Sequence, residues 1–217
     1  MKVLAQTRDY AVIDKPIGML SQPDREGSGE DAISALKRQI GGEIYPIHRL
    51  DRGTGGVMVF ARTKRAAALL SAAAADSTRM RKEYLAVVHG VCEEEGEMID
   101  LLLHRSVGNK SFVVDRMRSG VKEARLTYRR LGTLTDPEPL SLVQVALKTG
   151  RTHQIRVQFA HRGHPLHGDG KYGARSSGIP ALFCCSLTFP DPASGAELRF
   201  TALPSGSLWE RFPTPLL

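Results

Sequence analysis

The pattern of hydrophobic and polar positions divides the chain into many short strands. Uninterrupted apolar runs at residues 10–13 and 57–61 are typical of buried strands. In residues 142–148, Val143, Val145 and Leu147 occupy alternate positions, which places their side chains on one face of a strand. Further strands are predicted at residues 84–88, 111–114, 124–131, 182–189 and 197–202, and a turn joins the last two.

Segments with a helical pattern are fewer. Residues 32–40 carry apolar side chains at helical spacing, and Ser28 and Asp31 before them resemble a helix N-cap. Residues 65–75 are rich in alanine and leucine, which favours a helix. Residues 153–161 are ambiguous, although similar side chains four positions apart fit a helical period. Many strands, few helices and no internal repeat predict an α+β fold with a largely antiparallel sheet and no linker that splits the chain.

Composition excludes several protein classes. The 217 residues are 41% hydrophobic, which is enough for a core. No stretch approaches the ~20 uninterrupted apolar residues of a membrane span, and the N-terminus becomes polar before a signal-peptide core can form. Three cysteines without metal-ligand spacing fit a reduced protein better than a disulfide scaffold. We therefore expect a cytoplasmic protein that does not associate with membranes.

The charge distribution points to a polyanionic partner. Lys and Arg number 30 against 23 acids, a net charge of +7. Residues 148–175 hold six bases and one acid, and further basic runs lie at residues 79–82 and 116–130. The acids gather elsewhere, notably at residues 93–100. Such segregation is more typical of a surface that binds nucleic acid than of uniform solubilisation.

Three segments carry polar residues that neither a core nor a surface requires. Residues 48–56 (HRLDRGTGG) crowd charged side chains before glycines that permit close approach of a ligand; a turn in which Asp51 caps backbone amides is an equally good interpretation. Tyr84 follows a basic cluster and could stack on a base, although a half-buried strand tyrosine is the more ordinary interpretation. Residues 149–173 are dense in Arg, His and Gly, and a charged helix followed by a loop is the simpler interpretation.

The histidines in the C-terminal half and three further aspartates give no indication of a metal site or of additional catalytic residues. The histidines at positions 153, 161, 164 and 167 match no standard zinc spacing, so we expect no metal. Asp14, Asp169 and Asp191 lie near proline or glycine and are interpreted as turn-forming aspartates.

Together these segments resemble the RluA family of RNA pseudouridine synthases. Residues 48–56 are similar to its signature H-R-L-D-x-x-T-S-G, and residues 82–90 (KEYLAVVHG) to its K-x-Y-x-A-x-V-x-G block. Residues 149–173 are similar to T-G-R-T-H-Q-I-R-V followed by G-x-P-L-x-G-D-x-x-Y-G. Residues 14–18 (DKPIG) and 187–192 (LTFPDP) fall where the family carries D-K-P-x-G and L-x-F-x-H-P. Five blocks in the right order cover nearly the whole chain.

The chain departs from the family pattern at a few positions. Gly55 stands where the family usually has serine, and Gln158 replaces a common histidine. Phe183 and Cys184 replace a common His-Ala pair, and Asp191 replaces the histidine before Pro192. None of these positions carries the reaction, so the departures bear on substrate details more than on activity.

The resemblance implies isomerisation of uridine in RNA to pseudouridine, in which the N-glycosidic bond breaks and ribose C1′ joins C5 of the base. Asp51 is then the catalytic carboxylate, acting either as a nucleophile on the sugar or as a base toward a ribose proton. Both roles need the ionised form, which burial disfavours. Arg151, 100 positions away, is implied as the guanidinium that keeps the carboxylate ionised, so only the fold can join the two.

Three further site residues are implied by the same resemblance. Tyr84 lies against the uracil and assists loss of the C5 proton, and Ile155 lines the pocket and excludes water. Arg49 fills the gap left by the flipped base or holds the neighbouring phosphate. The reaction needs no cofactor and no metal. The implied fold is a long mixed, mostly antiparallel sheet with flanking helices and a central active-site cleft.

The expected organisation and partners follow from the same comparison. The catalytic blocks begin by residue 14, so residues 1–217 are expected to form a single catalytic domain without an S4 or other appended domain. The expected partner is ribosomal or transfer RNA, chosen through the basic runs and the loops at residues 105–118. We expect a monomer with no obligate protein partner.

Two other function classes stay open at this point. One is an RNA-binding module without catalysis, against which Asp51, Tyr84 and Arg151 argue because a pure binder has no use for an acid among bases. The other is a metal-dependent hydrolase that uses the histidine-rich segment, which a chelator would inactivate.

Overall fold

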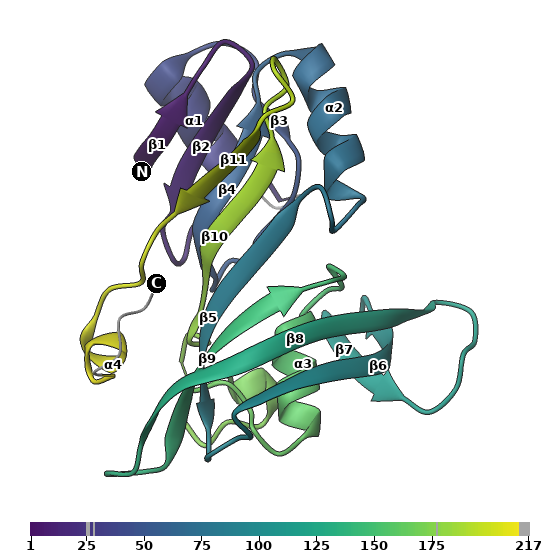
Figure 1. Cartoon of the computed structure of the whole chain (residues 1–217), viewed down its shortest axis with the longest axis vertical. Coiled ribbons are helices and arrows are strands. Elements are labelled where there is room, and N and C mark those ends of the chain that lie inside the picture. Colours follow the sequence, from purple (N-terminus) through teal and green to yellow (C-terminus); the bar gives the residue numbers. More distant parts are fainter. Residues whose placement is uncertain (25–26, 28, 177, 213–217) are drawn as a thin grey trace. The chain divides into compact units, whose positions relative to one another are not determined.

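The computed structural model describes residues 1–24, 27, 29–176 and 178–212 (Figure 1). The chain folds into two compact units. Unit 1 comprises Met1–Lys82 and Phe183–Pro204, and unit 2 comprises Glu83–Leu182 and Ser205–Leu217. None of the helices in the described part of the chain is long and apolar enough to span a membrane.

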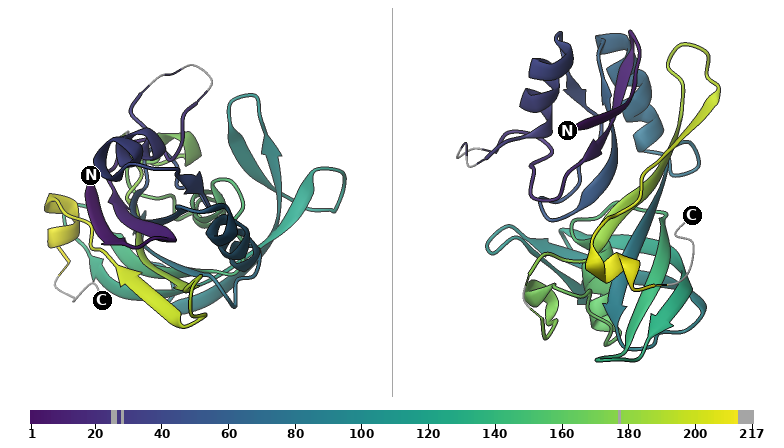
Figure 2. Two further views of the ribbon diagram at one scale, coloured as in Figure 1. Left: turned by 90° about the horizontal axis from the view of Figure 1, so that it is seen from above. Right: turned by 90° about the vertical axis from the view of Figure 1, so that its left-hand side faces the viewer.

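Unit 1 is built on a sheet with the strand order β1–β2–β4–β10, to which β3 adds beside β4 and β11 beside β10. Strands β4 and β10 are parallel, whereas the other described pairs are antiparallel. The elements are β1 (Lys2–Gln6), β2 (Tyr10–Lys15), α1 (Ala32–Ile40), β3 (Tyr45–Pro46), β4 (Gly55–Ala61), α2 (Lys64–Ala74), β10 (Leu182–Pro190) and β11 (Glu197–Thr201). Figure 2 shows the β10–β11 hairpin in yellow-green and yellow.

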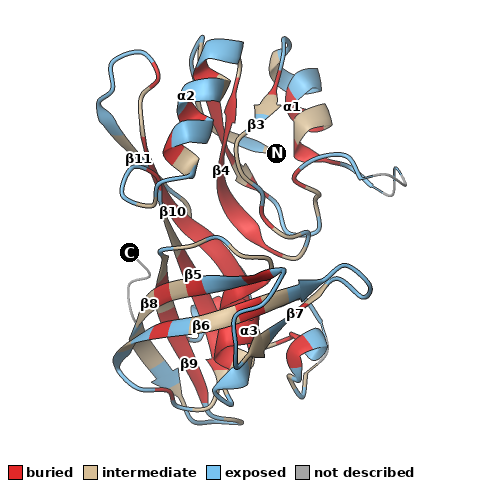
Figure 3. Ribbon diagram, turned by 90° about the vertical axis from the view of Figure 1, so that its right-hand side faces the viewer, coloured by how far each residue is buried: buried red, intermediate tan, exposed pale blue. Residues whose placement is uncertain are grey.

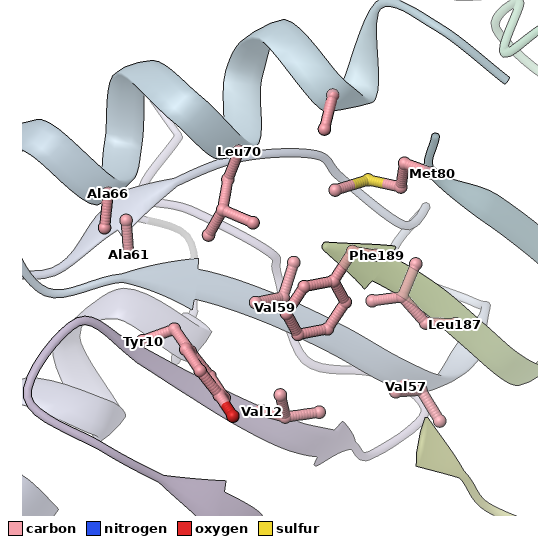
Figure 4. Close-up of a cluster of buried hydrophobic side chains, with 11 residues drawn as sticks. Tyr10, Val12, Val57, Val59, Ala61, Ala66, Leu70, Met80, Leu187 and Phe189 are labelled. Atoms are coloured by element: carbon pink, nitrogen blue, oxygen red, sulfur yellow. The ribbon is translucent and has the colours of Figure 1, made fainter. Parts of the chain in front are cut away.

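Both faces of the β2–β4 pair are covered, which explains why these strands read as continuous apolar runs. Val12 pairs with Val59 and Ile13 with Met58, and all four side chains are fully buried. Because alternate residues point to opposite faces, each pair packs into a different layer. On the Val59 face the cluster includes Leu70 of α2 (Figure 4).

The two helices of unit 1 begin at side-chain caps. Asp31 accepts a hydrogen bond from the Ser34 N–H, and Thr63 caps α2 in the same way. Gly41, with φ of 68°, ends α1. The predicted helices are therefore confirmed, while Ser28, the other residue of the expected cap, lies outside the described residues.

Unit 2 contains strands in the order β5–β9–β8–β6–β7. The β6–β7, β6–β8 and β8–β9 pairs are antiparallel. The elements are β5 (Arg81–His89), β6 (Glu95–Arg105), β7 (Lys110–Val114), β8 (Val121–Leu134), β9 (Leu140–Leu147), α3 (Gln154–His161), a 3-10 turn η1 (Gly170–Tyr172) and α4 (Ser207–Glu210). Figure 3 shows exposed, half-buried and buried residues interspersed along β6 and β8, in contrast to the buried β4 and β10.

The ambiguous segment at residues 153–161 forms α3, which packs against one face of this sheet. Val157 of α3 belongs to a cluster with Leu102, Ala124 and Tyr172. The side chain of Gln158 is fully buried and donates to a carboxylate oxygen of Asp100 at 2.7 Å. The glutamine that replaces a common histidine therefore joins α3 to β6.

Candidate active site

Asp51 lies on a tight turn immediately before β4. Its carbonyl oxygen accepts a hydrogen bond from the Thr54 N–H at 2.9 Å, and β4 begins at the next residue. Gly56 has a φ of 115°, and a Cβ atom there would lie 2.2 Å from the Cys184 carbonyl oxygen. Only glycine fits so close to β10. The pairing of β4 with β10 thus fixes the start of the strand and the turn that carries the half-buried Asp51.

Hydrogen bonds hold the residues on either side of Asp51. The Ser21 hydroxyl donates to the Leu50 carbonyl oxygen at 2.7 Å and accepts from the Leu50 N–H at 2.9 Å. On the other side, the Gly18 N–H donates to the Arg52 carbonyl oxygen at 2.8 Å, and Arg52 Nε returns a bond to the Gly18 carbonyl oxygen at 3.1 Å. The segment at residues 18–21 therefore fixes the backbone from which the Asp51 carboxylate projects.

Lys15 is a buried cation that acts on Asp51 within unit 1. Its side chain is 0% exposed, and Nζ donates to the carbonyl oxygens of Met19 at 2.7 Å and Pro16 at 3.1 Å. Burial lowers the pKa of Lys15 to about 8, and the negative charge of Asp51 opposes that shift. Lys15 is therefore a buried cation within electrostatic range of Asp51 that the motifs alone did not single out.

The lowered pKa of Lys15 predicts a pH-dependent stability. Below about pH 8 both states carry the proton, whereas between about 8 and 10.5 the native state releases it before the unfolded chain does. Stability therefore rises with pH through this window. Relative to Lys15→Met, the wild type should gain about 2 kcal/mol between pH 8 and roughly 9.5. Urea unfolding of both proteins at several pH values, followed by circular dichroism, measures this difference, and parallel curves would contradict it.

His48 fixes the beginning of the Asp51 segment as a neutral ring. Burial, and secondly the positive charge of Lys82, hold the pKa of His48 well below its ordinary value. Its Nε2 atom accepts a hydrogen bond from the Val59 N–H at 3.3 Å, which joins the segment to β4. Arg49, the next residue, is exposed. Its guanidinium is thus available to solvent on the same turn as Asp51.

The other three predicted site residues lie in unit 2. Tyr84 is on β5 and 6% exposed, and Ile155 is in the first turn of α3 and 4% exposed. Arg151 is half-buried before α3, and its Nε donates to the Glu123 carbonyl oxygen at 2.8 Å. Arg151 and Ile155 thus belong to one segment of unit 2, and Arg49 and Asp51 belong to one turn of unit 1.

One glutamine amide organises the segment that carries Arg151. Gln154 Oε1 accepts from the Thr149 hydroxyl at 2.8 Å and from the Arg151 N–H at 3.0 Å, while its Nε2 donates to the Arg125 carbonyl oxygen at 3.1 Å. His153 adopts a left-handed backbone with φ of 54°, a conformation that is uncommon outside glycine. The bend before α3 is therefore held against β8 by side-chain bonds.

Asp169 has a different role from the turn former expected from sequence. It is 1% exposed and receives two bonds from Arg156, from Nε at 2.6 Å and from a terminal nitrogen at 2.7 Å. The Arg156 guanidinium also lies 5.0 Å from the centre of the Tyr172 ring. The aspartate is thus half of a buried ion pair, whereas Asp191 does close a turn, accepting from Ala193 and Ser194.

Of the histidines in the segment at residues 153–167, one contacts Tyr172 and two contact His89. His153 is bonded to the Tyr172 hydroxyl at 3.0 Å, His164 to the His89 carbonyl oxygen at 2.9 Å, and His167 stacks on His89. Within residues 1–24, 27, 29–176 and 178–212, no three His, Cys, Asp or Glu side chains group so that they could hold a metal ion.

Comparison with known families decides the class of the protein. The sequence profile described as RNA pseudouridylate synthase matches residues 9–161. The chain belongs to this family. The match contains the Asp51 turn, β5 and the segment before α3, so the RluA-type assignment and the isomerase class predicted from the motifs are confirmed.

Curated relatives agree with the family. An uncharacterized RNA pseudouridine synthase of Chloroflexus aurantiacus is 38% identical over 204 residues, which cover 87% of this chain and 61% of the relative. The tRNA pseudouridine synthase C of Vibrio vulnificus is 34% identical and is covered over 76% of its length, against 79% of this chain. The ribosomal large subunit pseudouridine synthase D of Zymomonas mobilis is 29% identical, over 93% of this chain and 68% of its own.

Solved structures confirm the fold class. Human RNA Pseudouridylate Synthase Domain Containing 1 superposes with a TM-score of 0.75 over 99% of this chain and 96% of its own, at 22% identity. The corresponding domain-containing 4 protein gives a TM-score of 0.74 over 93% and 88%, at 23% identity. This RluA-type synthase therefore has the α+β fold of the pseudouridine synthases.

Two of the departures from the family pattern are in contact with each other. A Cβ atom on Gly55 would lie 3.1 Å from ring atoms of Phe183 and 3.0 Å from Cγ1 of Ile17. Such distances are tighter than ordinary van der Waals contact. The absence of a side chain at position 55 thus makes room for the large ring at position 183.

Proposed function

We propose that this synthase isomerises uridine in transfer or ribosomal RNA with Asp51 as its catalytic carboxylate. The observation that carries the proposal is the fixed position of Asp51 in the family signature. Leu50 and Arg52 are both bonded to residues 18–21, and the buried Lys15 lies within electrostatic range of Asp51. A carboxylate held in this way is prepared for a reaction at the sugar without further reorganisation.

The proposed reaction rearranges one nucleotide and needs no second substrate. The C1′–N1 bond breaks, the uracil turns, a C1′–C5 bond forms, the C5 proton leaves to solvent, and N1 ends with a proton. Asp51 either attacks C1′ or removes a ribose proton, and both routes use the ionised carboxylate. The proposed reaction uses neither a cofactor nor a metal ion.

The remaining site residues are proposed to serve the same nucleotide, as the family resemblance implies. Tyr84 contacts the uracil and assists loss of the C5 proton, and Ile155 excludes water. Arg151 supports ionisation of Asp51 together with Lys15. The exposed Arg49 holds a neighbouring phosphate or fills the space of the flipped base.

The cellular context is proposed from the same observations. Relatives carry the names tRNA pseudouridine synthase C and ribosomal large subunit pseudouridine synthase D, so both RNA classes are candidates for this chain. We propose that the 217 residues act as one catalytic domain, as a monomer without an obligate protein partner. The cysteines at positions 92, 184 and 185 are buried, and we propose that the protein works in the reducing cytoplasm.

The test is release of tritium from transfer and ribosomal RNA transcripts that contain 5-tritiated uridine. The purified protein should release tritium from one class without added metal or cofactor. Carbodiimide mapping of RNA from a strain that lacks the gene should then show the loss of pseudouridine at the same position. No release from either class, together with an unchanged map, would overturn the proposal.

A further inference from the structure

We infer that the β6–β7 hairpin is an RNA-binding surface on which an unpaired base of the substrate stacks against Phe112. The inference rests on the proposed function, because it assigns part of the RNA recognition of the same enzyme. It concerns unit 2 alone.

The position of Phe112 on β7 is unusual for an aromatic residue. It pairs with Leu103 of β6 and is 37% exposed, whereas its neighbour Ser111 points to the other face and is 2% exposed. Among the exposed large hydrophobic residues of the described chain, Phe112 is the only aromatic one. More than a third of its surface is accessible to solvent, and an aromatic face accepts any nucleobase by stacking.

Two cations lie over this ring from paired positions in the hairpin. Arg105 and Lys110 are cross-strand partners, and their charged groups lie over the Phe112 ring, 5.2 and 5.7 Å from its centre. A base that stacks on the ring displaces these groups from its face, and its phosphates then lie within reach of both flexible side chains. Aromatic rings combined with cations that track the backbone are the means by which proteins hold single-stranded nucleic acid.

The hairpin is anchored to the body of unit 2, so the ring is presented on a fixed support. Lys171 Nζ donates to the carbonyl oxygens of Gly108 at 3.0 Å and Asn109 at 3.3 Å, in the loop between β6 and β7. The Ser111 N–H donates to the Tyr172 hydroxyl at 2.8 Å. Little conformational entropy remains to be lost when RNA binds to such a surface.

The charge around the hairpin favours RNA as the occupant. Residues 104–130 contain eight Lys and Arg residues and two acids. Acids of the β6 region accompany Arg125 and Arg130, at 3.7 and 3.4 Å, which leaves the excess positive charge toward the hairpin and the loop at residues 115–120. A polyanion that also carries flat bases matches both the charge and the exposed ring.

The test measures binding of fluorescein-labelled oligouridylate by anisotropy at several salt concentrations. Phe112→Leu should weaken binding about 10-fold with an unchanged salt dependence, while Phe112→Tyr, which keeps the ring, should bind within about twofold of wild type. Arg105→Gln should lower the slope of log K against log salt by about 0.7. The matched control Leu69→Ala removes another exposed apolar side chain, on α2 of unit 1, and should bind as wild type does.

A base-free polyanion separates stacking from charge. Heparin should bind Phe112→Leu and wild type equally, because it has no bases to stack. Equal affinity of Phe112→Leu and wild type for oligouridylate, or an equal loss for heparin and oligouridylate, would overturn the inference. Unfolding curves of each variant, followed by fluorescence of Trp209 in unit 2, identify any variant that has lost its fold.

Tritium release from the RNA transcripts keeps this inference separate from the proposed function. A wild type that releases no tritium, with binding lost in Phe112→Leu, would overturn the function and support the surface. A wild type that releases tritium, with Phe112→Leu equal to it in binding and in kcat/KM, would support the function and overturn the surface.

Discussion

Replacement of Asp51 by asparagine is expected to lower the rate of tritium release by at least about 1000-fold. The amide cannot act as a nucleophile or as a base, and such roles contribute about 100- to 10,000-fold or more to an enzymatic rate. The amide has nearly the same shape as the carboxyl group. The hydrogen bond that closes the turn uses the backbone carbonyl oxygen of residue 51, so the turn should persist.

Single-turnover measurements with saturating RNA give the rate without a contribution from binding. The matched control is Asp76→Asn, an exposed aspartate of the turn after α2 whose Oδ1 accepts from Thr78. It should retain wild-type activity. RNA binding and the unfolding midpoint of the Asp51 variant should remain close to those of the wild type, and substantial activity in that variant would remove the carboxylate from the mechanism.

Asp169→Ala is expected to lower the free energy of unfolding by about 3–5 kcal/mol, the usual cost of removing one member of a buried ion pair. The carboxylate is almost completely buried and receives two short bonds from Arg156. Its loss leaves the guanidinium in a desolvated position without this counter-charge. Unfolding by guanidinium chloride, followed by Trp209 fluorescence, measures the change in unit 2, which contains both residues.

The double variant Arg156→Met with Asp169→Leu tests the origin of that loss. If a stranded charge is responsible, removal of both charges should recover much of the stability. Glu197→Ala, which breaks the exposed pair with Arg81 in unit 1, is the control and should have a much smaller effect. A double variant as unstable as Asp169→Ala would show that packing, and not charge, causes the loss.

The sequence predicted those parts of the fold in which local pattern and burial agree. The sequence of strand β4 is a continuous apolar run because both faces of the strand are covered. Helix α1 could be predicted because an N-cap residue and a glycine mark its two ends. Strand β6 escaped prediction. Its buried residues are Met98 and Leu102, four positions apart, and the acids Glu95, Glu97 and Asp100 lie among the others, a pattern that does not suggest a strand.

The candidate site shows the same division. Asp51 could be selected as the candidate catalytic residue because a whole motif surrounds it. The burial of Lys15 and the pairing of Asp169 could not be predicted. Lysine is usually exposed, and the turn after β2 that brings the carbonyl oxygens of Pro16 and Met19 to the Lys15 ammonium group is not evident from its sequence. For Lys15 the D-K-P-x-G block was the available signal. For Asp169, nothing local indicates a partner 13 residues away on a helix.

The contact between Gly55 and Phe183 constrains the routes by which this branch of the family could have diverged. A serine introduced at position 55 would place its Cβ atom 3.1 Å from ring atoms of Phe183, so the phenyl ring must shift for the serine to fit. The histidine that is common at position 183 has a smaller ring and leaves more space for that serine. A chimera that receives the usual signature at residues 48–56 alone should therefore be less stable than one that also receives histidine at position 183.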